Sequence, residues 1–187
     1  MKTKLILIGG VPGTGKTTVA YQLASKLKID KVLSVDIVKT FAKTYNQDFN
    51  EYVLTTTHEA YKLENISIIE GYLKHCNEIN KVVLETLKNI KDNIVIIEGT
   101  TINETFIEML DKEKYEITYL NLYLPSKELI KRYKLKSKLR KSNWIKNIKI
   151  IEKINDYLSR DNMCFFNDNL DNTIERIIKY VKKDLCL

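Results

Sequence analysis

The chain has 187 residues, a length typical of one domain, so residues 1–187 are expected to fold as a single unit around its own core. Its three cysteines lack C-x-x-C spacing, which argues against a disulfide framework or a zinc site, and no apolar stretch has the length of a signal peptide or membrane span. We therefore expect a cytoplasmic protein without membrane contact. Its formal net charge of +7 favours an anionic partner. Charge alone does not tell whether this partner is a nucleotide, a phosphorylated metabolite or a nucleic acid.

The first expected elements are a buried strand and a glycine-rich loop. Residues 5–8 read LILI, the unbroken apolar pattern of a strand covered on both faces of a parallel sheet. Residues 10–17 read GVPGTGKT and fit the phosphate-binding P-loop motif G-x-x-x-x-G-K-[ST]. Apolar residues then recur every four positions from Val19 to Leu27, which predicts a helix beginning near Gly15. This strand–loop–helix context favours a nucleotide site over a purely structural glycine turn, because the N–H groups of loop and helix converge on phosphates.

The motif assigns a role to each residue of the loop. Lys16 is expected to reach the β- and γ-phosphates of ATP and to act in catalysis, and Thr17 to place its hydroxyl on Mg²⁺. The glycines allow the backbone to approach the phosphates closely. The predicted nucleotide-binding residues are Gly10, Val11, Pro12, Gly13, Thr14, Gly15, Lys16, Thr17 and Thr18.

Residues 31–35 form the second predicted strand, which ends in Asp36, where a helix is expected to start. Because this strand is expected next to the first, Asp36 is a candidate general base that takes the proton from an acceptor hydroxyl. Aspartate is also a favoured N-cap residue, so a capping role is the alternative. Lys39 follows three residues later, where it either pairs with an acidic substrate or is solvated.

An insertion over about residues 40–91 is predicted to be mostly helical, with its clearest apolar stripe between Ile79 and Ile90. The next buried strand, residues 94–97, ends in Glu98 and Gly99. Glu98 is a candidate to hold Mg²⁺ directly or through water, and the alternative is a carboxylate that stabilises the next helix. Many hydrolytic motor ATPases have a second acid where this chain has Gly99, so the sequence favours transfer over hydrolysis.

Thr101 and Glu104 have the spacing of a capping box for the next helix. Residues 117–124 are predicted as a fourth strand and residues 164–166 as a short fifth, before a final amphipathic helix. Strands that alternate with helices predict an α/β three-layer sandwich of the P-loop NTPase, nucleotide-kinase-like type, with a parallel sheet of about five strands. Ligands in such sheets bind outside the carboxyl ends of the strands, so the P-loop, Asp36 and Glu98 are expected to be neighbours.

A basic segment over about residues 126–145 is predicted to form a helical lid. Between Lys131 and Lys141, seven of eleven residues are basic and none is acidic. A cationic lid that closes over the phosphates would neutralise the transferred group and exclude water. Arg132 and Arg140 are its candidate catalytic residues, because a planar guanidinium binds phosphate through two hydrogen bonds. The alternatives are a solvated charged face and a nucleic-acid-binding patch.

In these features the chain resembles the P-loop kinases grouped around archaeal 2-phosphoglycerate kinase. The matching segments occur in order along most of the chain, at residues 8–10, 13–18, 34–36, 56–60, 70–72, 96–99 and 151–158. The resemblance implies phosphorylation of a small acidic hydroxyl metabolite, 2-phosphoglycerate in that family, with ATP and Mg²⁺ as cofactors. Lys39 occupies a position at which many related kinases have arginine.

Related phosphotransferases place their acceptor pocket in the insertion, and this implies the substrate-binding residues Asp36, Lys39, Thr57, His58 and Tyr72. A capping box formed by Thr56 and Glu59 is the structural alternative for part of this segment. His58 and His75 also fit ordinary surface or core histidines, and neither is assigned a catalytic role.

The sequence thus predicts an ATP-dependent small-molecule kinase with an alcohol group as acceptor. A nucleoside, nucleotide or sugar-derivative kinase is the alternative within this class, because the P-loop and lid serve all of them. A nucleic-acid-associated NTPase or nucleotide-dependent switch is the alternative from another class, and the single acid at Glu98 disfavours it.

Overall fold

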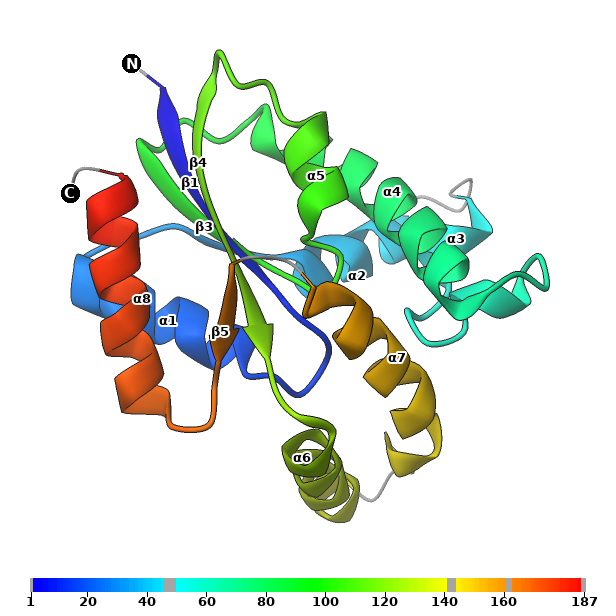
Figure 1. The fold of residues 1–187 in the computed structure, drawn as a ribbon. Coiled ribbons are helices and arrows are strands. Elements are labelled where there is room, and N and C mark those ends of the chain that lie inside the picture. Colours follow the sequence, from blue (N-terminus) through cyan, green and yellow to red (C-terminus); the bar gives the residue numbers. More distant parts are fainter. Residues whose placement is uncertain (1, 46–49, 141–143, 161–162, 186–187) are drawn as a thin grey trace.

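The computed structural model describes residues 2–45, 50–140, 144–160 and 163–185. Within these ranges, five strands form one sheet in the order β2-β3-β1-β4-β5, and every adjacent pair is parallel (Figure 1). The strands are β1 (Thr3–Gly9), β2 (Val32–Ser34), β3 (Ile94–Glu98), β4 (Tyr115–Tyr123) and β5 (Cys164–Phe166). The predicted five-stranded parallel sheet is confirmed.

Helices connect the strands and cover the sheet. They are α1 (Lys16–Leu27), α2 (Val35–Tyr45), α3 (Glu51–Leu54), η1 (Ala60–Lys62), α4 (Ile68–Leu87), α5 (Glu104–Met109), α6 (Ser126–Arg140), η2 (Trp144–Asn147), α7 (Ile148–Leu158) and α8 (Leu170–Asp184). The predicted insertion thus comprises α2, α3, η1 and α4, and the predicted lid corresponds to α6 and η2, with residues 141–143 outside the described part of the chain. None of the helices in the described ranges is both long and apolar enough to cross a bilayer.

Alternating side chains of the strands form two hydrophobic cores, one on each face of the sheet. Leu5 and Leu7 of β1 pack with residues of α4 and α5, whereas Ile6 and Ile8 pack with residues of α1 and α8. This is the period of two expected of a strand whose faces are both buried. Figure 1 shows the resulting three layers, with α1 and α8 on one side of the sheet.

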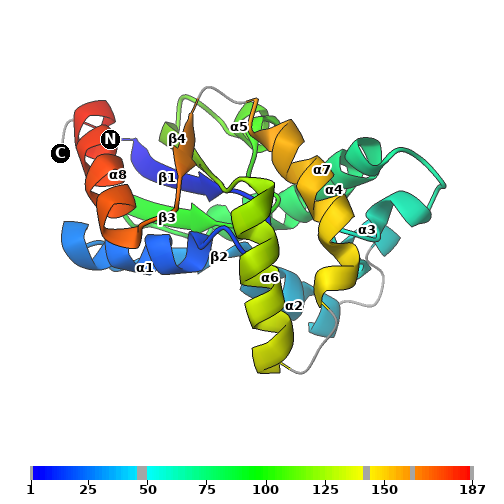
Figure 2. The ribbon, with the colours of Figure 1, turned by 60° about the horizontal axis from the view of Figure 1, so that its bottom comes forward.

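A third hydrophobic cluster holds α6 and α7 against α4. It includes Tyr72 of α4, Leu129 and Tyr133 of α6, and Ile151 and Ile154 of α7, all nearly or fully buried. Figures 1 and 2 show α6 beside the carboxyl ends of the strands. Helix α6 is therefore anchored by its own apolar face.

Two details of the fold differ from the sequence-based expectations. β2 does not lie next to β1, because β3 pairs with both of them. The four apolar residues of β3 suit this inner position, whereas the three half-buried residues of β2 form an edge. The second difference is that α5 is capped by Asn103, whose side chain accepts from the backbone N–H of Phe106 at 3.2 Å. The hydroxyl of Thr101 instead donates to Asn80 Oδ1 at 2.9 Å.

Candidate active site

The loop between β1 and α1 has three glycines with positive φ, of which two show why glycine is needed. Gly15, directly before α1, has φ of 95°. Gly10 has φ of 132°, and a Cβ atom there would lie 2.6 Å from the carbonyl oxygen of Leu122. Because side chains rarely tolerate either conformation, the loop exposes backbone rather than side chains to the space in front of α1.

Lys16 is the first residue of α1 and is only 8% exposed. Its ammonium donates to the carbonyl oxygen of Val11 at 3.2 Å. Burial lowers the pKa of Lys16, while the nearby carboxylates of Glu98 and Asp36 act in the opposite direction. An anion bound in front of the loop would therefore stabilise this cation further.

Thr17 and Glu98 meet beside Lys16. The Thr17 hydroxyl donates to Glu98 Oε1 at 3.1 Å, and Glu98, at the end of β3, is only 3% exposed. Hydroxyl and carboxylate oxygens are the ligand types that Mg²⁺ prefers, with phosphate and water oxygens completing its coordination. The two side chains therefore fit a magnesium site. Nowhere in the described residues is a group of three or more His, Cys, Asp or Glu residues placed to hold a metal, so at this site phosphate and water oxygens would have to supply the other ligands.

One cavity of about 720 Å³ joins the nucleotide loop to the proposed acceptor side. Most residues predicted from the sequence line it: Pro12, Gly13, Gly15, Lys16, Thr17, Thr18, Asp36, Lys39, Thr57, His58, Glu98 and Arg132. Gly10, Val11 and Thr14 also belong to the loop but are buried and do not line the cavity. The cavity is also lined by Thr56, Thr100, Leu135 and Lys136, which the sequence did not single out as binding residues.

Helix α2 carries Asp36 and Lys39 to the wall of this cavity. Asp36 is exposed and is the second residue of α2, so it lies inside the first helical turn rather than at the N-cap. Lys39 donates to the carbonyl oxygen of Thr55 at 2.6 Å. Burial, reinforced by the charge of Lys43, lowers the pKa of Lys39 to about 8, although Asp36 acts against this shift.

His58 and Thr56 belong to the loop between α3 and η1. Burial lowers the pKa of His58, despite the neighbouring carboxylate of Glu59. The Thr56 hydroxyl donates to Glu59 Oε2 at 2.7 Å. Together with Thr57, these residues line the same cavity as the P-loop, although they lie far from it in the sequence.

Tyr72 does not line this cavity. It is fully buried in the cluster between α4, α6 and α7, and its hydroxyl donates to the carbonyl oxygen of Thr100 at 2.9 Å. The insertion therefore places Tyr72 behind the cavity wall, where it supports Thr100 instead of reaching a ligand.

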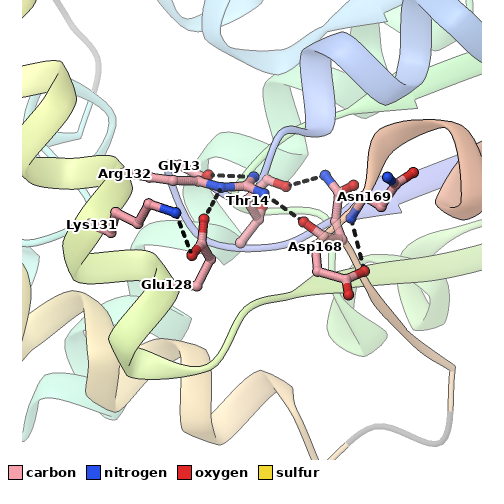
Figure 3. A network of polar contacts seen from close by, with 8 residues as sticks. Gly13, Thr14, Glu128, Lys131, Arg132, Asp168 and Asn169 are labelled. Carbon is pink, nitrogen blue, oxygen red and sulfur yellow. Dashed lines mark hydrogen bonds and ion pairs between the residues drawn. The ribbon is translucent and has the colours of Figure 1, made fainter.

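Arg132 of α6 connects the lid helix to the P-loop, as the network in Figure 3 shows. Its guanidinium donates to the carbonyl oxygen of Asn167 at 2.6 Å and approaches that of Gly13 at 3.5 Å. Arg132 also pairs with Glu128, at 3.4 Å. The side chain of Arg140, the second arginine predicted for the lid, lies outside the described residues.

Asn167, which follows β5, is a site residue that sequence reasoning missed. It is only 3% exposed, and its side-chain amide donates to the carbonyl oxygen of Thr14 at 2.7 Å. The usable signal was its position, because a polar residue directly after an apolar strand lies at the edge where ligands bind. Asn167 and Arg132 together link the P-loop, α6 and the loop before α8.

Solved structures of known proteins share this fold at low sequence identity. TT1252 from Thermus thermophilus superposes with a TM-score of 0.62 at 17% identity, and 99% of each chain is covered. Shikimate kinase from Bacteroides thetaiotaomicron has a TM-score of 0.55 at 18% identity, again with 99% of each chain covered. At these identities the likeness concerns the architecture.

Sequence relatives are more specific. The chain is 28% identical to a 2-phosphoglycerate kinase of Methanocaldococcus jannaschii over 82% of its own length and 53% of that protein. It is also 28% identical to the 2-phosphoglycerate kinase of Methanococcus vannielii, over 95% and 64% of the two chains. A mevalonate-3-phosphate 5-kinase of Thermoplasma acidophilum is 32% identical over 51% and 50%. The chain thus spans between half and two thirds of the curated relatives it matches.

A family model described as an AAA domain matches residues 6–152, which include the P-loop, Asp36, Glu98 and the whole predicted lid segment. The match extends over well more than half of the chain and agrees with the fold and with the geometry of the loop. The chain therefore belongs to the AAA domain family AAA_18.

Proposed function

We propose that this chain is an ATP- and Mg²⁺-dependent phosphotransferase that phosphorylates a hydroxyl group of a small acidic metabolite of the 2-phosphoglycerate type. The observation that carries the proposal is the shared cavity, which is lined both by Lys16 and Thr17 of the P-loop and by Asp36 and Lys39 of α2. A nucleotide and a small acceptor fit together in about 720 Å³. The similarity to archaeal 2-phosphoglycerate kinases supports the choice of acceptor.

The P-loop side would bind the nucleotide and neutralise its charge. The backbone N–H groups of the loop and the Lys16 ammonium bind the β- and γ-phosphates. Thr17 and Glu98 would hold Mg²⁺, which when bound shields the phosphate oxygens from one another. Arg132, which lies at the loop, would contact the transferred group once its guanidinium exchanges the carbonyl of Asn167 for phosphate oxygens.

The α2 side would bind and activate the acceptor. Lys39, Thr57 and His58 provide a cation and polar groups for an acidic metabolite. The acceptor oxygen attacks the γ-phosphorus in line while its proton passes to the Asp36 carboxylate, and the bond between the γ-phosphorus and the bridging oxygen breaks to leave ADP.

The test is ATP turnover against a defined set of acceptors. We expect ADP formation with 2-phosphoglycerate, which is assayed first, followed by mevalonate 3-phosphate, nucleosides, nucleotides and sugar derivatives. Lys16→Ala serves as the control and is expected to abolish transfer with the fold intact. Absence of a magnesium–ATP complex in calorimetry on the folded protein would refute the proposal, and turnover with a nucleoside alone would move it to the alternative kinase class.

The basic residues of α6 bear on the competing nucleic-acid hypothesis. Arg132 and Lys136 line the cavity, and Lys131 pairs with Glu128 at 3.5 Å. Part of the basic segment is thus directed to the small-molecule site. Nucleic-acid binding with a steep salt dependence, together with nucleic-acid-stimulated ATP turnover, is the result that would restore the alternative.

A further inference from the structure

His75 of α4 is a buried polar residue to which the proposed reaction gives no role. It is 1% exposed, and its Nδ1 lies 2.7 Å from the carbonyl oxygen of Tyr52 in α3. A carbonyl oxygen only accepts hydrogen bonds, so Nδ1 must carry the proton and donate it. The ring is thereby fixed in one orientation and, when neutral, in one tautomer.

The opposite edge of the ring faces two cavity-lining side chains. Nε2 of His75 lies 3.3 Å from the Lys39 ammonium nitrogen and 3.4 Å from the Thr57 hydroxyl oxygen. Burial lowers the pKa of His75 to about 3, reinforced by the positive charges of Lys39 and Lys43 and opposed by the bond to Tyr52. At neutral pH the ring is therefore uncharged, and Nε2 has a lone pair that accepts from both donors.

Lys39 and Thr57 come from different elements, and both side chains contact Nε2 of His75. Lys39 belongs to α2 and also donates to the Thr55 carbonyl, whereas Thr57 belongs to the loop after α3. Both line the cavity, and the ring of His75 lies behind them on α4. A lysine side chain has a flexible four-carbon stem, so a hydrogen bond to a fixed acceptor restricts the position of its ammonium group.

We propose that His75 is a positioning residue for the phosphoryl acceptor, which anchors its ring on the Tyr52 carbonyl through Nδ1 and holds the Lys39 ammonium and the Thr57 hydroxyl at the cavity wall through Nε2. This inference rests on the proposed function, because it takes the wall around Lys39 as the acceptor side. Preorganised binding groups lower the entropy lost when the acceptor binds, so His75 acts on acceptor affinity without touching the acceptor itself.

Two near-isosteric variants separate the two edges of the ring. In His75→Asn the amide reaches only the position of Nδ1, so the bond to Tyr52 is kept and the acceptor at Nε2 is lost. In His75→Gln the longer amide reaches the position of Nε2 and restores that acceptor. We expect His75→Asn to raise the KM for the acceptor about tenfold, the scale of one lost hydrogen bond to a charged group, while His75→Gln stays within about threefold of the wild type.

The turnover number and the affinity for magnesium–ATP should change by less than about twofold in both variants, because the P-loop is untouched. Asn80→Ala is the matched control, since Asn80 is also a buried polar residue of α4 and bonds to Thr101. It is expected to lower the melting temperature without raising the acceptor KM. Equal acceptor KM values in His75→Asn and His75→Gln would overturn the proposal. So would an acceptor KM that rises as much in Asn80→Ala as in His75→Asn.

A measurement without acceptor distinguishes failure of this inference from failure of the proposed function. Nitrogen-15 NMR of the wild-type protein should show His75 protonated at Nδ1 and unprotonated at Nε2 from about pH 5 to about pH 8. The ε-carbon resonance of Lys39 should be a single sharp signal in the wild type and in His75→Gln. In His75→Asn it should broaden or split, because the Lys39 side chain is no longer held in one position. A ring that titrates in this range, or that carries its proton on Nε2, refutes the role of His75 even in an active kinase. Lack of turnover with every acceptor, when these NMR results hold, counts against the proposed function alone.

Discussion

At the scale of single residues, the site combines a buried cation with a buried carboxylate around a glycine-rich loop. Lys16 is 8% exposed and Glu98 is 3% exposed. The hydroxyl of Thr17, the residue after Lys16, donates a hydrogen bond to Glu98. Burying charged groups is costly unless partners offset it. Such groups gathered in a cavity are typical of functional sites, and here they match the charge pattern of a magnesium–triphosphate group.

Asp36→Asn tests the proposed general base. The amide keeps the size of the side chain but does not take a proton, so we expect turnover to fall by about 10² or more while magnesium–ATP still binds. The measurements are the turnover number with saturating acceptor and calorimetric ATP affinity. Because Asp36 lies in the first turn of α2, loss of thermal stability with unchanged turnover would instead assign it to the helix dipole.

The pKa of Lys39, lowered to about 8, predicts a pH dependence of acceptor use. Lysine carries its charge below its pKa, so raising the pH through about 8 removes the cation from the free enzyme and should lower kcat/KM for an acidic acceptor. The charged and titratable groups around it are Asp36, Lys43, His75 and Cys76. The pH profile of kcat/KM is the measurement.

Lys39→Arg is the control for this profile, because guanidinium stays charged throughout the range. The decline above about pH 8 should disappear in this variant. A flat profile in the wild type, or the same decline in both proteins, would contradict the assignment to Lys39.

At the scale of elements, α6 is attached to the P-loop by Arg132. Its guanidinium contacts the carbonyl oxygens of Gly13 and Asn167, which belong to the P-loop and to the segment after β5. Tyr133 and Leu129 on the same helix anchor it in the third core. The helix therefore combines a fixed apolar side with a cation, Arg132, held at the P-loop.

Arg132→Ala should lower the turnover number by about 10² to 10³ while changing ATP affinity less, because a guanidinium at the transferred group acts mainly in the transition state. Lys131→Ala is the matched control on the same helix, since Lys131 is exposed and pairs only with Glu128 among the ion pairs of the described residues. Steady-state kinetics of both variants decide the question. Equal turnover in Arg132→Ala and the wild type would remove Arg132 from catalysis.

The elements were more predictable than their arrangement. The P-loop, the buried strands and the cavity residues next to them follow from local apolar runs and from a motif with strong backbone requirements. The position of β3 between β1 and β2 depends on pairing between distant segments, which local pattern does not encode. The same holds for Asn167, whose bond to Thr14 joins residues 153 positions apart in the chain.

Side-chain direction was the other limit on sequence-based prediction. Tyr72 and His75 both lie on α4 within the insertion, yet Tyr72 points into the third core and His75 toward Lys39. Which face of a helix meets the cavity depends on how α3, η1 and α7 pack around it. The presence of Thr57 and His58 at the cavity was therefore predictable, whereas the burial of Tyr72 and the contact of His75 with Lys39 were not.

At the scale of the whole molecule, the cavity lies where the carboxyl ends of the strands meet α2, α6 and the P-loop. Ligand bound there contacts elements from both sides of the sheet. Because a ligand that binds only the folded state stabilises it by mass action, the occupancy of the site is measurable as global stability.

Magnesium–ATP at about 100 times its dissociation constant should raise the free energy of unfolding by about 2.7 kcal/mol, or the melting temperature by about 5 to 10 °C for a chain of this size. Differential scanning calorimetry provides the measurement. Lys16→Ala should show a much smaller shift at the same nucleotide concentration. An identical shift in the two proteins would place the nucleotide elsewhere, and no shift in the wild type would argue against ATP as its ligand.

The edge position of β2 has a consequence for the catalytic cycle. This three-residue strand leads directly into α2 with Asp36 and Lys39, whereas the P-loop follows β1, which is held between β3 and β4. Segments with fewer neighbours open at lower free energy than the centre of a sheet. On the proposed function, α2 would therefore open more readily than the P-loop, and the phosphorylated acceptor would leave before ADP.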